Sequence, residues 1–133
     1  MTPSASIEPG IVTGDGAALA GFYCDALGFT VDAVLTFPQG VVRRLCRGEA
    51  RLKLYQPDRT AGAAPPAGKW PDRAGWAYAA LHVTDATAEA ESVRAGGGTV
   101  ITEVTAHRPG ARFALIADPE GNVWELLQEA PPA

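Results

Sequence analysis

The sequence predicts an α+β protein in which two tandem βαβββ modules form curved half-barrel sheets around a cleft. Two strand-like runs, "EPGIVTGD" at 8–15 and "YAALHVTD" at 78–85, share one layout and end in Asp. Each Asp is a good N-cap and precedes an Ala-rich helical segment that ends at Gly. Three further strand-like stretches follow each helix, separated by turn residues. The repeated layout therefore predicts the same βαβββ unit twice.

The first module begins with the strand at 8–15, and the helix after it carries an apolar face. Its apolar residues recur at the spacing of one side of a helix: Leu19, Phe22, Tyr23, Ala26 and Leu27. Gly28 is placed to end this helix. The turns "FPQG" and "RGE" then separate three predicted strands at 31–36, 40–47 and 50–56.

The second module repeats this order with a weaker helical pattern. After the strand at 78–85, the apolar positions of the helix are Ala86, Ala90 and Val93, and a run of three glycines at 96–98 ends it. The turns "AHRPG" and "DPEGN" then separate predicted strands at 100–104, 112–117 and 122–128.

The chain of 133 residues can bury one core, so we expect a single domain, 1–133. Its modules lie at approximately 5–57 and 76–129, and a linker rich in Pro, Gly and Ala covers 58–75. The composition of this linker predicts a plain connecting loop. The alternative is a lid that carries Trp70 over a pocket.

The composition argues against several classes of function. The net charge of −4 and the absence of a basic run argue against nucleic-acid binding. No apolar run approaches the roughly 20 residues of a membrane span, and "MTPSASIEPG" lacks the features of a secretory signal. Cys24 and Cys46 follow no disulfide or metal pattern, so we expect reduced thiols and a cytoplasmic protein, with a disulfide left as the alternative.

Strand periodicity places charged residues on the face opposite the helix. In "LKLY" at 52–55 the two leucines belong on the helix side, which puts Lys53 and Tyr55 on the other. In "WEL" at 124–126 the same alternation turns Glu125 away from its apolar neighbours. Four residues at corresponding places in the modules could therefore project from one concave surface: Glu8, Lys53, Tyr78 and Glu125. For a lone strand carboxylate, a solvated face is the alternative.

The layout, together with "GDGAALAGFYCDALGF" and "ADPEGNVWELLQ", resembles the vicinal oxygen chelate superfamily over essentially the whole chain. That superfamily includes glyoxalase I, extradiol dioxygenases, fosfomycin-resistance enzymes and bleomycin-binding proteins. The resemblance implies a glyoxalase-like fold and a homodimer. The motifs are specific for the fold and not for one activity.

In metal-dependent members of that superfamily, four strand positions supply the ligands, commonly His, Gln or Glu. The resemblance matches these positions to Glu8, Lys53, Tyr78 and Glu125. The two glutamates suit a metal, whereas the Lys53 ammonium offers no lone pair and repels a cation. We therefore expect no cofactor; a divalent metal, if bound, would use the two glutamates.

We hypothesise that the Lys53 ammonium takes the place of the metal between Glu8 and Glu125, with the Tyr78 hydroxyl nearby. Replacing Lys53 with Met would then cost a few kcal/mol if the trio is buried. The alternative is a surface lysine on an edge strand.

Three other residues are candidates for ligand contacts. His82, four residues after Tyr78, suits a general base or a hydrogen-bonding ligand contact, or else a structural histidine bonded to backbone. Arg112 can clamp a ligand carboxylate or phosphate, or pair with a nearby acid. Of the adjacent Arg43 and Arg44, only one can face the cleft, and periodicity leaves open which.

The leading functional prediction is a small-molecule-binding protein without the standard metal site. A planar or hydrophobic metabolite or antibiotic would stack on aromatic side chains, and sequestration would confer resistance. The aromatic candidates are Tyr55, Tyr78, Trp70 and Trp76. The alternatives are a metal-independent isomerase or cyclase, with Glu8, Glu125 and His82 as catalytic groups, and a metal-dependent lyase or dioxygenase.

Overall fold

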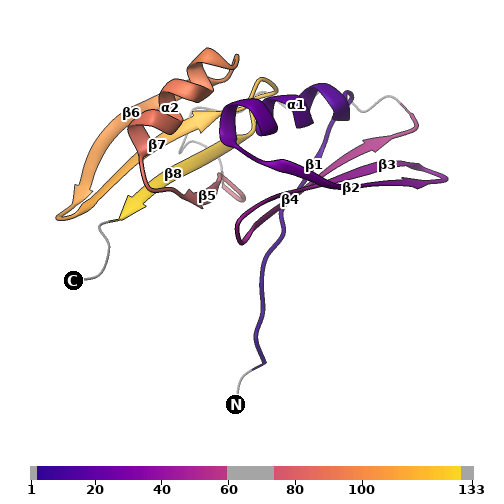
Figure 1. Ribbon diagram of the computed structural model, residues 1–133, viewed down its shortest axis with the longest axis horizontal. Coiled ribbons are helices and arrows are strands. Elements are labelled where there is room, and N and C mark those ends of the chain that lie inside the picture. The colour runs from indigo at the N-terminus through magenta and orange to yellow at the C-terminus, as the bar shows by residue number, and fades with distance from the viewer. Residues whose placement is uncertain (1–2, 60–73, 130–133) are drawn as a thin grey trace. The chain divides into compact units, whose positions relative to one another are not determined.

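The computed structural model describes residues 3–59 and 74–129, and these form two compact units (Figure 1). The first module contains strands β1 to β4 and most of helix α1. The second module contains strands β5 to β8 and helix α2.

Each module has the order βαβββ, which confirms the predicted fold class. The first comprises β1 (Gly10–Val12), α1 (Gly16–Leu27), β2 (Thr30–Phe37), β3 (Gly40–Arg47) and β4 (Ala50–Pro57). The second comprises β5 (Ala79–His82), α2 (Ala86–Ala95), β6 (Thr99–Arg108), β7 (Ala111–Ala117) and β8 (Val123–Glu129). The strand orders, β1-β4-β3-β2 and β5-β8-β7-β6, are equivalent, and in each sheet only the first strand pairs in parallel.

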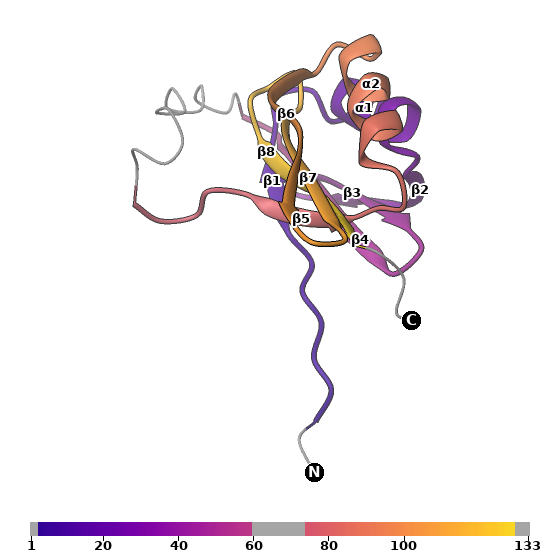
Figure 2. The same ribbon diagram turned by 90° about the vertical axis from the view of Figure 1, so that its left-hand side faces the viewer.

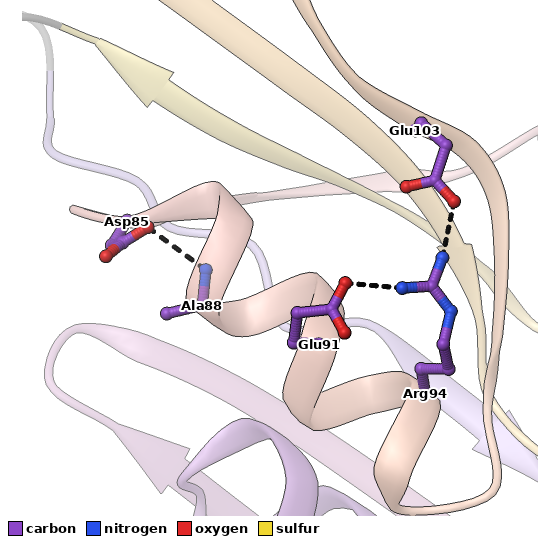
Figure 3. A network of polar contacts seen from close by, with 5 residues as sticks. All are labelled: Asp85, Ala88, Glu91, Arg94 and Glu103. Atoms are coloured by element: carbon purple, nitrogen blue, oxygen red, sulfur yellow. Dashed lines mark hydrogen bonds and ion pairs between the residues drawn. The ribbon is translucent and has the colours of Figure 1, made fainter.

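Both helices begin at the predicted aspartates. Asp15 accepts a hydrogen bond through Oδ1 from the Ala18 amide at 3.0 Å, and Asp85 accepts one from the Ala88 amide at 3.0 Å (Figure 3). The two N-caps have nearly the same backbone angles, φ −143° and ψ 85° against φ −145° and ψ 88°. A side-chain acceptor at this position satisfies an amide that has no partner within the helix.

A charged contact ties α2 to the neighbouring strand β6. Arg94, in the last turn of α2, pairs with Glu91 on the same helix and with Glu103 on β6 (Figure 3). The hydrogen bond that Arg94 donates to Glu91 and the negative charge of Glu103 raise the pKa of Arg94 above its usual value. The guanidinium therefore keeps its positive charge.

The buried faces follow the predicted alternation. In the first module Leu45, Leu52 and Leu54 are fully buried, and in the second Trp124 and Leu126 are buried. Burying a large apolar side chain contributes about 1.5 to 3 kcal/mol relative to leaving it exposed. Helix α2 packs against β6, β7 and β8 along this side of its sheet (Figure 1, Figure 2), through its predicted apolar positions Ala86, Ala90 and Val93.

Three predicted strands differ from the observed ones by more than one residue. Strand β1 spans Gly10–Val12 and not 8–15, and Ile7 before it is 87% exposed. Strand β5 spans Ala79–His82 and not 78–85. Strand β6 runs to Arg108 and not to residue 104. Its register against β7 shifts three times along its length. Such irregularities interrupt the period of two on which a sequence-based strand prediction depends.

Candidate functional site

The open face of the first module, opposite the buried leucines, is divided into an apolar and a charged half. Cross-strand register joins four residues into one row across the sheet: Val12, Tyr55, Val42 and Leu35. The adjacent row on the same face is made of Gly10, Lys53, Arg44 and Ala33. The two rows are two residues apart along each strand, which corresponds to about 7 Å.

The charged half is built around Glu8. Glu8 Oε2 lies 3.9 Å from Lys53 Nζ, and Glu8 Oε1 lies 3.6 Å from Arg44 Nε. The Lys53 amide also donates to the Pro9 carbonyl at 2.9 Å, which holds the segment before β1 against β4. The structure therefore brings together two of the four predicted residues, Glu8 and Lys53, and adds a second cation.

The pairing of β3 with β4 shows which of the two adjacent arginines shares a face with Lys53. Arg44 pairs with Lys53 and shares its open face. Arg43 lies on the opposite face, where its Nη1 donates to Gln56 Oε1 at 3.4 Å. The sequence reveals that the two side chains diverge, but only the pairing of β3 with β4 shows that Arg44 belongs to the site.

The charges around Glu8 do not suit a divalent metal. A divalent ion bound to Glu8 would stand within about 6 Å of the Lys53 and Arg44 charges, given metal–oxygen distances of about 2 Å. At an effective dielectric constant of about 20, each repulsion is on the order of 6 kcal/mol. Neither cation can serve as a ligand, because neither offers a lone pair.

Tyr55 stands at the centre of the apolar row. It is half-buried between Val12 on β1 and Val42 on β3. Its hydroxyl donates to the Gln39 carbonyl at 3.2 Å, which fixes the ring orientation. The ring is thus held in place on a face whose remaining row members are aliphatic.

Glu125 occupies the position in the second module that Lys53 occupies in the first. Lys53 pairs with Gly10, and Glu125 pairs with Ala80 in the equivalent parallel strand. On its other side Glu125 faces the buried Leu115. Among the residues that the structure describes, its half-buried carboxylate makes no hydrogen bond or ion pair. Glu125 therefore lies on the face of its sheet opposite the buried Trp124 and Leu126, as the alternation predicted.

Tyr78 lies just before strand β5, and His82 is the last residue of that strand. Tyr78 is 39% exposed. The exposed His82, opposite Leu127, has its Nδ1 3.6 Å from Glu129 Oε1, and Glu129 also pairs with Arg108. The imidazole thus lies beside a carboxylate that is already paired with Arg108.

The remaining predicted contacts are distributed elsewhere. Arg112 is exposed and pairs in register with Gln128, on the face of the second sheet that carries α2. Trp76 is 99% exposed. Trp70 lies outside the described residues. Across residues 3–59 and 74–129, no three His, Cys, Asp or Glu side chains are grouped so that they could hold a metal ion.

The model of the Glyoxalase/Bleomycin resistance protein/Dioxygenase superfamily matches residues 6–126. The chain belongs to this superfamily. A search of curated proteins found no significant match. A membrane-spanning helix is not found in the part of the chain that the structure describes.

Solved structures agree with the superfamily assignment at the level of the fold. A glyoxalase family protein from Bacillus cereus is similar with a TM-score of 0.82 and 14% identity, over 98% of this chain and 97% of that one. A protein designated SMU.1112c has a TM-score of 0.76 and 26% identity, over 96% and 100%. Glyoxalase I from Zea mays has a TM-score of 0.75 and 18% identity, over 93% of this chain but 44% of that one. The chain thus spans less than half the length of the maize enzyme.

Proposed function

We propose that this superfamily member binds a small molecule on the open face of its first module without a resident metal ion. The supporting observation is that Glu8 forms ion pairs with two cationic side chains, Lys53 at 3.9 Å and Arg44 at 3.6 Å. Glu8 is one of the two glutamates at the positions that supply metal ligands in the family. Lys53 itself stands at a second ligand position. The ammonium supplies the positive charge that a metal would bring, without a ligand-exchange site.

The ligand class follows from the same face. An apolar row with a fixed tyrosine suits a planar or hydrophobic metabolite or antibiotic. Sequestration of such a compound would confer resistance. We further propose that the protein acts as a homodimer in the cytoplasm, in keeping with Cys24 and Cys46 as reduced cysteines outside any disulfide.

The metal-free proposal is tested by elemental analysis of protein purified without chelator, followed by calorimetric titration with planar compounds before and after chelator treatment. We expect substoichiometric metal and the same dissociation constant in both titrations. Stoichiometric metal that is lost in a Glu8→Gln variant would overturn the proposal. Light scattering over a concentration series tests the dimer, since a monomer mass throughout would contradict it.

A metal-independent isomerase or cyclase is a second candidate, favoured by Glu125. A half-buried carboxylate beside Leu115, with no bonded partner among the described residues, is available as an acid or base. The test is to incubate each bound compound with the protein and analyse it by mass spectrometry and NMR. Turnover that disappears in Glu125→Gln while binding is retained would support an enzyme. Unchanged compounds throughout would support binding alone.

A further inference from the structure

We propose that the ligand carries an anionic group, a carboxylate or a phosphate, on a flat apolar body, and that Arg44 binds the anion. This inference rests on the proposed binding function and names the ligand class for the open face of the first module. Two observations carry it: an excess of positive charge in the charged half, and its place beside the apolar row.

The charge count leaves one cation without a counter-charge. Glu8 contributes one negative charge to a cluster in which Arg44 and Lys53 contribute two positive charges. A third cation on this face, Arg51, donates from Nη1 to the carbonyls of Gly48 and Ala50 at 2.8 and 3.0 Å. The cluster therefore favours an added negative charge.

Arg44 is the residue with hydrogen-bonding capacity to spare. Its guanidinium makes no hydrogen bond to any described residue, and its Nε is buried without a hydrogen-bond partner. Its contact with Glu8, at 3.6 Å, is an ion pair without a hydrogen bond. A guanidinium presents a planar set of donors that matches the oxygens of a carboxylate or phosphate. The side chain remains 40% exposed, so a ligand can reach it.

The apolar row sets the shape of the rest of the ligand. Val12, Tyr55 and Val42 lie on three neighbouring strands, and Leu35 on a fourth. Neighbouring strands are about 5 Å apart, so the row spans about 14 Å. Leu35 is 40% exposed and Val12 is 62% exposed, which leaves the row open to a ligand. The Arg44 row runs parallel to it about 7 Å away. Two fused rings centred on Val42, which shares strand β3 with Arg44, cover about half of this row, and an acidic substituent on one edge reaches toward Arg44.

The test uses three probes that differ in one substituent: 2-naphthoate, 2-naphthyl phosphate and the neutral 2-naphthamide. Their dissociation constants are measured by calorimetry at low and moderate salt. We expect 2-naphthoate or 2-naphthyl phosphate to bind at least about tenfold more tightly than 2-naphthamide. Whichever anion binds more tightly identifies the acidic group.

Variants separate the two halves of the face. Arg44→Gln should remove the preference for the anion and change the affinity for 2-naphthamide by a much smaller factor. Leu35→Gln should raise the dissociation constants of all three probes by similar factors. Arg94→Gln, a matched exposed arginine in the second module, should change none of them.

Each other outcome contradicts a defined part of the account. Equal affinity for anionic and neutral probes, or an anion preference that survives Arg44→Gln, overturns the inference but leaves the binding function intact. A failure of all three probes to bind at millimolar concentration overturns the inference and also counts against the binding function. Circular dichroism of each variant establishes that it is folded.

Discussion

Gln56 and Gln128 accept equivalent hydrogen bonds from the helix N-termini of the two modules. Gln56 Oε1 accepts a hydrogen bond from the Gly16 amide at 2.8 Å, and Gln128 Oε1 accepts one from the Ala86 amide at 2.9 Å. Each glutamine lies in the last strand of its module, and each amide belongs to the first residue of the helix. The internal repeat therefore extends to a long-range contact that satisfies a helix end.

Removal of either glutamine acceptor is expected to destabilise the protein. Gln56→Met and Gln128→Met keep the side-chain length but leave a helix amide without its partner, at a cost of about 1 kcal/mol each. Because the two contacts lie in different modules and share no partner, the double variant should lose the sum. Urea unfolding measures both. A loss well below the sum in the double variant would show that the modules do not contribute independently.

The buried Asp118 is expected to be critical for the hairpin between β7 and β8. Its Oδ1 accepts from the amides of Glu120 and Asn122 at 2.9 and 3.0 Å, and Oδ2 accepts from Asn122 Nδ2 at 2.8 Å. Asp118→Ala should lower the free energy of unfolding by about 2 to 3 kcal/mol, because it leaves three part-buried donors without their acceptor. Asp118→Asn should lose less, since it keeps one acceptor. Equal stability of Asp118→Ala and the parent in thermal melts would refute this role.

Gly40 is expected to tolerate no side chain. A Cβ at this position would lie 2.3 Å from the Gln56 carbonyl oxygen and 2.8 Å from Pro57 Cα, both backbone atoms of β4. Gly40→Ala must push β3 away from β4, at a cost of about 1 to 3 kcal/mol. Gly10→Ala is the control, because nothing lies within 4 Å of its Cβ. Differential scanning calorimetry should show a lower Tm for Gly40→Ala only; a matching decrease in both would point to glycine content and not to contact.

Lys53→Met is expected to have a small effect on stability. The Lys53 side chain is 47% exposed and Glu8 keeps its contact with Arg44, so the ion pair is worth less than about 1 kcal/mol. Chemical unfolding at two salt concentrations measures this loss, which salt should reduce. A loss of several kcal/mol would indicate that Lys53 is buried against further charges, as in the predicted trio with Glu125.

The sequence predicted local structure better than long-range pairing. The positions of Lys53 and Glu125 could be inferred because each is flanked by apolar residues that the structure buries. Arg44 could not be chosen over Arg43, because that choice depends on the pairing of β3 with β4 and both residues fit a strand. Asp118 was recognised as a turn residue, but its burial depends on contacts that periodicity does not describe. The sequence analysis placed Glu8, Lys53, Tyr78 and Glu125 on one concave surface, and that arrangement stays a prediction.

The equivalence of Lys53 and Glu125 has a consequence for protein engineering. Two tandem copies of the first module would present two ammonium groups at this register, and two copies of the second would present two carboxylates. Only the natural chain, in which the two modules differ, carries one ammonium and one carboxylate at these positions. Exchanging the two residues, as Lys53→Glu with Glu125→Lys, preserves the total charge of the chain while moving the ammonium from one half to the other.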